Sequence, residues 1–530
     1  MKKLKELFLK NENKIVITLL IIIISLGVIT RIYIGSKKEY LQIDEGYSYG
    51  LMNYEQIDLT KKDDLYNNWH TKEYYKDYLS INSEEALDFM PVYENQKNDV
   101  HPPFYYLLLR IAASFTIDSF SMWTGIILNI IIYAISSIFI YLIANKIFNN
   151  KVYALLMVLI NTFSYAAIET TIFIRMYALN GLNLLMVLYL HMCCLNKENL
   201  SLKQLIPMSI LIIIGSLTHY YYLVFLFVLY VIYMLYNICK KNFKNAIRYT
   251  IMMVISAIVS LVIFPYSFVH IFMGYRGTGA VSKLESIEQI WNSLGRYLGI
   301  LNNNTFNGIL IFLVIISFII IVYKIVKNRK LVIEFKDKNF WFMFIPAFFY
   351  FILVALVSPY KEIRYIMPVC PFMIIGIFYL IKVLLEKVIS SKNTFIVLSI
   401  IFITMLIYPK LTDIEISYLY KGYGATVERI EEHHNIPMLY ILNLKDNRFL
   451  DDVYLYSKVD NSFILDSDMF EENKIEEIFE DINTTNGIYV MISEHMDYEK
   501  YLDTIKQTLN FSSYEHVARM NACDIYQMKK

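Results

Sequence analysis

The sequence is poor in charged residues, glycine, proline and cysteine, and each shortage excludes a class of protein. Charged residues make up 18% of the 530-residue chain, whereas hydrophobic residues make up 56%. Soluble globular domains have about 25% charged residues. The chain has only 17 glycines and 11 prolines, so it is neither collagen-like nor a low-complexity disordered protein. The five cysteines of the chain form no disulfide framework and have no spacing typical of metal ligands.

An excess of charge of one sign is also missing. The chain has 49 lysines and arginines and 48 aspartates and glutamates. Its net charge is therefore +1, and no overall electrostatic field favours binding to nucleic acid. What the chain does have is a mean hydropathy of +0.42 and many aromatic residues, with Tyr 45 and Phe 34. These values indicate a membrane protein with several spans.

Long hydrophobic runs support this interpretation, because roughly 20 apolar residues are needed to cross a bilayer as a helix. Ile15–Ile34 has this length, follows several lysines and lacks the short apolar region and cleavage site of a signal peptide. It is therefore predicted to be an uncleaved first span with a cytoplasmic N-terminus. The complete bundle is predicted to have about eleven spans. The others are expected near 121–143, 152–168, 177–195, 204–217, 220–237, 249–272, 307–326, 339–357, 364–381 and 394–409.

Lysines and arginines in the connecting segments test this count independently, because cytoplasmic loops of membrane proteins are rich in both. Alternation places six segments in the cytoplasm, and all of them carry lysine: 1–14, 144–151, 196–203, 238–248, 327–338 and 382–393. A count wrong by one span would place these basic segments outside. The distribution therefore agrees with the predicted topology.

The predicted fold is mostly α-helical: a polytopic transmembrane bundle with a small outer α/β domain at the C-terminal end. Residues 1–410 are expected to form the membrane module, including a long outer loop at 35–120. Residues 411–530 are expected to form the outer domain, with strands at Met438–Leu442, Ser462–Leu465 and Gly487–Ile492 and a helix at Tyr498–Leu509. No internal repeat is evident.

The unusual polar motifs all fall on the predicted outer face. Asp44 and Glu45 follow the first span and could supply a general base or a cation site, although an adjacent acid pair is also common in solvated loops. His101-Pro102-Pro103 begins an apolar stretch, Phe104–Phe115, that suits a helix along the membrane interface. The histidine of this motif could equally be incidental to a helix start.

Three further motifs have the same alternatives of function and structure. Glu169 and Arg175, followed by Met176 and Tyr177, could bind substrate or form an ion pair with each other. His219 in Thr218-His219-Tyr220 stands at a tight turn, beside tyrosines that are typical of an interfacial aromatic belt.

The third of these motifs, residues 358–365, contains Lys361, Arg364 and Tyr365. A guanidinium there could bind a phosphate by two hydrogen bonds, or simply extend to the interface. The stretch 275–279, with one arginine and two glycines, is a weak signal. If the bundle folds on itself, the acid pair and the cationic groups could converge on a lipid-linked phosphate.

In their order, these motifs resemble the polytopic C-type glycosyltransferases, especially the protein O-mannosyltransferase and lipid A aminoarabinose transferase group. The motifs that carry the resemblance are Asp44-Glu45, His101-Pro102-Pro103, Arg175-Met176-Tyr177, Thr218-His219-Tyr220 and Arg364-Tyr365 with Pro368. The similarity covers about residues 1–410 and is most specific in the acid pair and the His-Pro-Pro segment.

The resemblance implies a transferase in the plasma membrane that moves a hexosyl or pentosyl group from a polyprenyl-phosphate donor to an acceptor hydroxyl outside, with inversion. Asp44 would be the general base and Glu45 would orient a substrate. The expected substrate-binding residues are His101, Arg175, Tyr177, His219, Lys361, Arg364 and Tyr365. The acceptor would be a cell-surface glycan, a glycolipid or a protein.

No cofactor is expected, since the sequence lacks a compact ligand spacing for a divalent metal. The alternative function is a transporter or flippase for lipid-linked sugars. Such a protein would need charged groups within its spans and access from both faces.

Overall fold

The computed structural model describes residues 2–53, 65–274, 287–328, 337–443 and 449–530. The chain divides into two compact units. The first contains Met1–Ser36, Val100–Tyr105 and Ile126–Ser417, and the second contains Lys37–Asp99, Tyr106–Gly125 and Tyr418–Lys530. The segment after the first span thus clusters with the C-terminal part of the chain. The predicted division at 410/411 remains a prediction.

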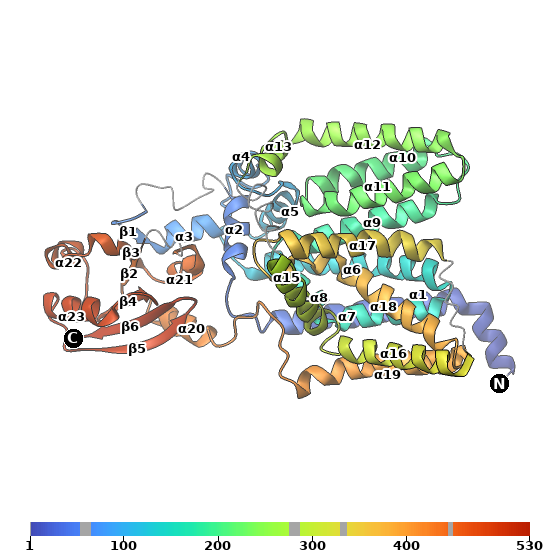
Figure 1. Ribbon diagram of the computed structural model, residues 1–530. Helices are drawn as coiled ribbons and strands as arrows, with labels where there is room; N and C mark the ends of the chain where they lie inside the picture. Colours follow the sequence, from blue (N-terminus) through green and yellow to red (C-terminus); the bar gives the residue numbers. More distant parts are fainter. Residues whose placement is uncertain (1, 54–64, 275–286, 329–336, 444–448) are drawn as a thin grey trace. The chain divides into compact units, whose positions relative to one another are not determined.

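The first unit is a bundle of apolar helices that lie side by side (Figure 1). Among the described residues, nine helices are long and apolar enough to cross a membrane, or ten if one bent pair counts as a span. The nine stretches are Asn11–Gly35 of α1 (Lys2–Gly35), α6 (Met122–Phe148), α9 (Tyr177–Cys194), α11 (Tyr221–Cys239), α12 (Phe243–Ile263), α16 (Leu310–Asn328), α17 (Lys338–Val357), Met367–Leu385 with α18 (Cys370–Leu385), and α19 (Ser391–Leu411).

Two of the predicted spans differ from the structure in detail. The stretch predicted near 152–168 forms α7 (Lys151–Phe163) and α8 (Tyr165–Ile172), which meet at an angle of 57°. The break occurs because Ser164 is extended and its hydroxyl accepts a hydrogen bond from Ala167 N–H, which starts a new helix. The stretch predicted near 204–217 is α10 (Leu202–Ser216), with only 15 residues.

Short elements join the long helices of this unit. They are α13 (Tyr266–Phe272), α15 (Ile287–Ile300), the π-helix η2 (Leu301–Thr305), and the 3₁₀ turns η3 (Ile363–Tyr365) and η4 (Met367–Val369). The helix α5 (Phe104–Ala113) confirms the helix expected after the His-Pro-Pro segment. The helical membrane fold is therefore confirmed.

The second unit contains a six-stranded sheet in the order β1-β3-β2-β4-β6-β5 (Figure 1). The strands are β1 (Trp69–Thr71), β2 (Met438–Leu442), β3 (Asn461–Asp466), β4 (Ile488–Ser493), β5 (Ser513–Met520) and β6 (Cys523–Lys529). The central strands β3, β2 and β4 are parallel, whereas β1, β5 and β6 are antiparallel to their neighbours. All residues of β2 and β4 are buried, as expected for parallel strands covered on both faces.

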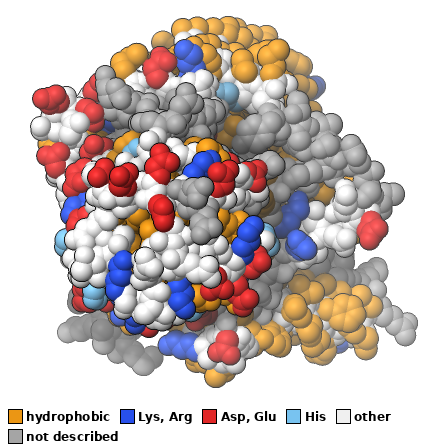
Figure 2. All heavy atoms as spheres, turned by 90° about the vertical axis from the view of Figure 1, so that its left-hand side faces the viewer, with side chains coloured by type: hydrophobic (Ala, Val, Ile, Leu, Met, Phe, Trp, Pro, Cys, Tyr) orange, Lys and Arg blue, Asp and Glu red, His pale blue; other side chains and the backbone are white. Residues whose placement is uncertain are grey.

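Helices accompany the sheet in this unit. They are α2 (Ile43–Met52), α3 (Lys72–Leu79), α4 (Met90–Asn98), α20 (Gly424–Glu432), η6 (Phe449–Asp452), α21 (Val453–Tyr456), η7 (Ser467–Met469), α22 (Glu472–Phe479) and α23 (Tyr498–Thr508). One core packs Leu439, Val490 and Phe463 against Ile475 of α22 and Leu502 of α23. Charged side chains of both signs are interspersed over the surface of the C-terminal part (Figure 2).

The strand β1 comes from the predicted outer loop and was not expected. Trp69 pairs with Phe463 of β3, and its indole N–H donates to Ile478 O at 2.7 Å. Its ring also packs edge-on against Phe463 and Phe479, each at 5.3 Å. The segment 37–99 and the C-terminal part therefore share one sheet.

Candidate active site

Four of the predicted site residues meet through their rings in the first unit. The His219 ring lies 6.1 Å from that of His101 and 5.4 Å from that of Tyr177, measured between centroids. Tyr177 in turn lies 6.0 Å from Tyr365. These residues come from the segment just before α5, the start of α9, the turn between α10 and α11, and η3. Segments that are distant in sequence thus build one cluster.

The turn that carries His219 is held by its neighbours. Thr218 Oγ1 accepts a hydrogen bond from Asn183 Nδ2 of α9 at 3.0 Å, and Leu217 O accepts one from Phe104 N–H at 2.9 Å. The second bond ties the His-Pro-Pro segment directly to this turn. Packing then explains why His101 stands beside His219.

The environment of His219 keeps its imidazole neutral. The side chain is 6% exposed, and burial lowers its pKa well below the ordinary value, with the electrostatic effects of His101 and Arg175 acting in the same direction. Its Nδ1 accepts the Tyr221 N–H at 3.0 Å. The remaining proton is therefore on Nε2, which makes that nitrogen a hydrogen-bond donor.

Arg364 lies beside this cluster in η3. Its side chain is buried, and its Nε lies 3.1 Å from Glu362 Oε2. The guanidinium carbon is 5.1 Å from the centroid of the Tyr365 ring, a cation–π distance. Tyr350 OH donates to Tyr365 O at 3.1 Å and so anchors the turn to α17. A buried arginine held in this way is suited to bind an anion.

Lys361 has a different environment from Arg364. Its ammonium group donates to Ala355 O at 3.0 Å and to Ser358 O at 3.4 Å. These carbonyl groups lie at the C-terminal end of α17, where a cation is stabilising. The contacts of Lys361 thus favour a role in capping this helix, and its predicted contact with substrate remains a prediction.

Arg175 is 4% exposed and lies in the turn between α8 and α9. The ion pair with Glu169 that the sequence allowed is wrong. Within the described residues, the Glu169 carboxylate accepts hydrogen bonds from Asn304 Nδ2 at 2.9 and 3.0 Å and from Ser417 N–H at 2.7 Å. The packing of η2 against α8 explains the difference, because it supplies a neutral donor where Arg175 was expected.

Asp44 and Glu45 belong to the second unit, in the first turn of α2. Asp44 is half-buried, whereas Glu45 is fully buried and lies 2.8 Å from the ammonium group of Lys38. At the other end of the helix, the Arg110 guanidinium donates to Met52 O. Both ends of the helix that carries the acid pair are therefore anchored.

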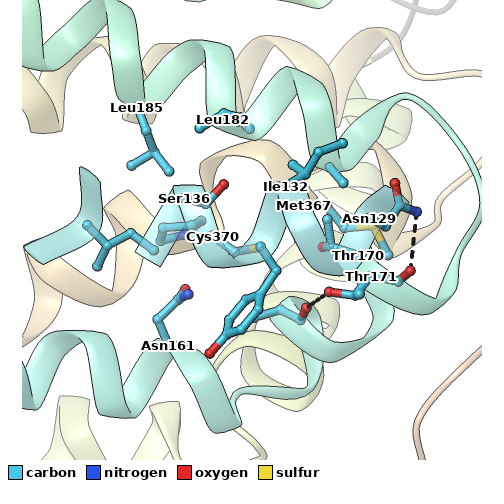
Figure 3. A pocket seen from close by; sticks show the side chains of 16 residues that line it. Asn129, Ile132, Ser136, Asn161, Thr170, Thr171, Leu182, Leu185, Met367 and Cys370 are labelled. Carbon is cyan, nitrogen blue, oxygen red and sulfur yellow. Dashed lines mark hydrogen bonds between the residues drawn. The ribbon is translucent and has the colours of Figure 1, made fainter. Parts of the chain in front are cut away.

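A pocket inside the first unit is lined by none of the predicted site residues (Figure 3). Asn129, Asn161, Ser136 and Thr170 contribute polar groups to its lining, and leucines of α9 contribute apolar ones. Its wall also includes Met367, Cys370 and Pro371, which follow the Arg364-Tyr365 turn in the chain. The pocket is thus a neighbour of the cluster in sequence, with separate lining residues.

Sequence reasoning missed the buried cation Lys38 and the buried Arg31. The Arg31 guanidinium lies 3.5 Å over the Tyr133 ring and donates from Nε to Thr171 Oγ1 at 3.0 Å. Both residues look like ordinary basic flanks of the first span. The signals available were the position of Lys38 between the first span and the acid pair, and the position of Arg31 inside the apolar run.

Over the described ranges, no group of three or more His, Cys, Asp or Glu side chains could hold a metal ion. The donor set of the cluster around His219 consists of arginine, histidine and tyrosine, which suits a negatively charged group better than a cation.

Comparison with known proteins gives matches in sequence and in fold. Residues 100–264 match the family described as dolichyl-phosphate-mannose-protein mannosyltransferase. Among curated protein sequences, none matches the chain.

Two crystal structures of ArnT from Cupriavidus metallidurans have the same fold, each with 11% sequence identity over 96% of this chain and 97% of that chain. The TM-score is 0.51 for ArnT bound to undecaprenyl phosphate and 0.50 for the apo state. The archaeal oligosaccharyltransferase AglB from Archaeoglobus fulgidus has a TM-score of 0.49 and 11% identity, over 97% of this chain and 74% of that chain. The resemblance inferred from the motifs is thereby confirmed: residues 100–264 match the mannosyltransferase family, and the chain has the fold of ArnT.

Proposed function

We propose that the protein transfers a sugar from a polyprenyl-phosphate donor to an acceptor hydroxyl on the outer face of the plasma membrane, with inversion at the anomeric carbon. The observation that carries the proposal is the buried cluster of Arg175, His219 and Arg364, in which two guanidinium groups and a neutral imidazole gather in one unit. A phosphate is the ligand that fits such a donor set. ArnT, which has this fold, was crystallised with undecaprenyl phosphate.

Asp44 is the proposed general base. It accepts the proton of the acceptor hydroxyl while the oxygen attacks the anomeric carbon of the donor sugar. The bond between that carbon and the phosphate oxygen breaks, and its electron pair leaves with polyprenyl phosphate. Glu45, on the same helical turn, is proposed to orient a substrate indirectly, because its buried carboxylate belongs to the capping box that sets the position of Asp44.

The cations stabilise the leaving group in this scheme. Negative charge grows on the phosphate as the bond breaks, and Arg364 and Arg175 are placed to bind it. Nε2–H of His219 adds a neutral donor, and the rings of His101, Tyr177 and Tyr365 complete the site. Because the arginines supply the charge, the proposal requires no cofactor.

The outer location rests on the distribution of basic residues. Lysines and arginines concentrate in the segments assigned to the cytoplasm, so the opposite ends of the helices face outward. The cluster around His219 lies at these opposite ends. The sugar would be a hexosyl or pentosyl group, and the acceptor a cell-surface glycan, a glycolipid or a protein.

Sugar transfer in purified membranes tests the proposal. A panel of polyprenyl-phosphate sugars is incubated with wild type and with Asp44→Asn, and release of polyprenyl phosphate is measured. A general base contributes roughly 10²–10⁴-fold, so Asp44→Asn should lose nearly all transfer while remaining folded. Asp503→Asn, at an exposed position of α23, is the matched control and should behave as wild type.

Two results would contradict the proposal. Transfer by Asp44→Asn at the wild-type rate would remove Asp44 from the role of base. If wild type releases polyprenyl phosphate from none of the donors in the presence of acceptor, a transporter of lipid-linked sugars becomes the better explanation. The anomeric configuration of the product, measured by NMR, decides whether transfer inverts.

A further inference from the structure

Lys38 is a buried cation a few residues beyond the end of α1, in the second unit. Its side chain is 1% exposed, and Nζ lies 2.8 Å from Glu45 Oε2 and 2.6 Å from Tyr418 O. The Glu45 side chain is 0% exposed. Both hydrogen bonds are made to protein groups away from solvent, so Lys38 is not placed to bind a substrate phosphate.

The oxygen that binds Lys38 also starts the helix that carries Asp44. Glu45 Oε2 accepts the Gln42 N–H at 2.7 Å, and Gln42 Oε1 accepts the Asp44 N–H at 2.7 Å. This reciprocal arrangement is a capping box, which sets where a helix begins and how the chain enters it. The position of Glu45 is therefore coupled to the backbone of Asp44.

The other partner of Lys38 belongs to the start of the C-terminal part. Neighbouring bonds strengthen this junction: Glu39 N–H donates to Leu419 O at 2.9 Å, and Glu39 Oε2 accepts from Gly422 N–H at 2.6 Å and Gly424 N–H at 2.9 Å. Residues 38–39 thus connect the segment that follows the first span with residues 418–424.

Burial makes the Lys38–Glu45 pair sensitive to the loss of one partner. Desolvation lowers the pKa of Lys38, and the charge of Glu45 opposes this effect. Removing one member leaves a buried charge without its counterion, whereas removing both leaves a neutral site. A residue that binds or reacts with substrate through its charge has no such dependence on a neighbour.

We propose that Lys38 is a positioning residue, which holds the Asp44 helix to the start of the C-terminal part through Glu45 and the Tyr418 carbonyl. Glu45 acts in the reaction through this contact, and the C-terminal part serves to fix the general base. The inference rests on the proposed function, since it assigns Asp44 the role of base. It adds a residue and a role for the C-terminal part that the proposed function does not contain.

The test compares Lys38→Met, Glu45→Gln and the double variant in the full chain. Each single variant should lower kcat by roughly tenfold or more with little change in KM for the donor, because the arginines of the first unit are untouched. The double variant should recover to within about threefold of wild type, since no unpaired charge remains. Lys37→Met, at the exposed neighbouring lysine, is the matched control and should keep wild-type kcat.

Hydrogen exchange gives a second measurement that does not depend on activity. Amides of residues 43–52 should exchange faster in Lys38→Met than in wild type and regain protection in the double variant, while the membrane helices remain protected in all of them. If no donor supports transfer by wild type, the proposed function fails, and exchange over α2 still decides the positioning role.

Three results would overturn the inference. The first is a double variant as inactive as Glu45→Gln, because the Glu45 carboxylate would then be required for itself. The second is Lys38→Met with wild-type kcat. The third is unchanged exchange of the α2 amides in Lys38→Met.

Discussion

The imidazole rings of His101 and His219 lie 6.1 Å apart and tilted by 54°, although they come from segments far apart in the chain. The contact is made possible by the hydrogen bond from Phe104 N–H to Leu217 O. It places two titratable rings next to a buried arginine, and the electrostatic effects of His101 and Arg175 both oppose protonation of His219. The electrostatics of the site follow from this arrangement.

The free energy of unfolding should therefore depend on pH through His219. Its pKa in the folded protein lies below the unperturbed 6.5, so below that pH the unfolded chain binds a proton that the folded one does not. The contribution of His219 to the free energy of unfolding should be fully present above pH 6.5. It should decrease as pH falls below 6.5, by at most about 1.4 kcal/mol per pH unit. His219→Gln should remove this part of the loss between about pH 6.5 and 5.

Thermal unfolding in detergent, measured across that range, checks the prediction. His433→Gln, at an exposed histidine of the second unit, serves as the control and should leave the pH dependence as in wild type. An unchanged pH dependence in His219→Gln would show that the imidazole is not kept neutral by its surroundings.

Sugar transfer should depend on the guanidinium group of Arg364 and not only on its positive charge. Replacement by lysine keeps the charge but removes the planar fork that binds a phosphate by two hydrogen bonds. We expect Arg364→Lys to lower kcat by roughly 10²–10³-fold, the loss typical of one donor to a developing oxyanion. Steady-state sugar transfer measures this effect. The exposed Arg519, changed to lysine, should retain wild-type transfer.

Lys361 should show the opposite behaviour, because its contacts are with the end of α17. Lys361→Met should lower the free energy of unfolding by about 1 kcal/mol, the value of one or two helix-terminal hydrogen bonds. Transfer per folded molecule and KM for the donor should change little. A large rise in KM without loss of stability would instead support the contact with substrate that the sequence suggested.

Gly215 is the glycine on which the His219 turn depends. A Cβ atom there would lie 2.3–2.5 Å from ring atoms of Tyr222, whose hydroxyl is bound to Leu211 O at 3.1 Å. Since that ring is buried and held, Gly215→Ala should cost about 1–3 kcal/mol in unfolding and reduce transfer by displacing the turn.

The matched control for Gly215→Ala is Gly295→Ala in α15, where a Cβ would meet nothing within 4 Å. That change should be neutral or stabilising by about 0.5–1 kcal/mol, because alanine favours a helix. Equal effects of the two substitutions would show that the Tyr222 contact is unimportant.

The elements that were predicted well have signals contained within a short window. Met438–Leu442 and its parallel neighbours are apolar runs of strand length, and each is a strand in the structure. β1 has only three residues, too few for periodicity to show. It is a strand because Trp69 pairs with Phe463, a partner that no local pattern can indicate.

The site residues divide in the same way. The sequence identified His101, Tyr177, His219 and Tyr365 as outer polar or aromatic groups, and the structure brings their rings together. The sequence also singles out Glu169. Its partners, however, depend on where η2 packs, and the spacing between Glu169 and Arg175 does not indicate this.

The sequence by itself determined the membrane architecture, because the length of each apolar run and the basic segments between them are sufficient to place helices in a bilayer. Only the tertiary structure decided which polar side chains meet. Lys38 and Glu45 are seven residues apart, yet Lys38 also donates to the carbonyl of Tyr418, at the start of the C-terminal part. Burial makes that pairing obligatory, since a charge removed from water must find a partner, and burial is decided by contacts between distant segments.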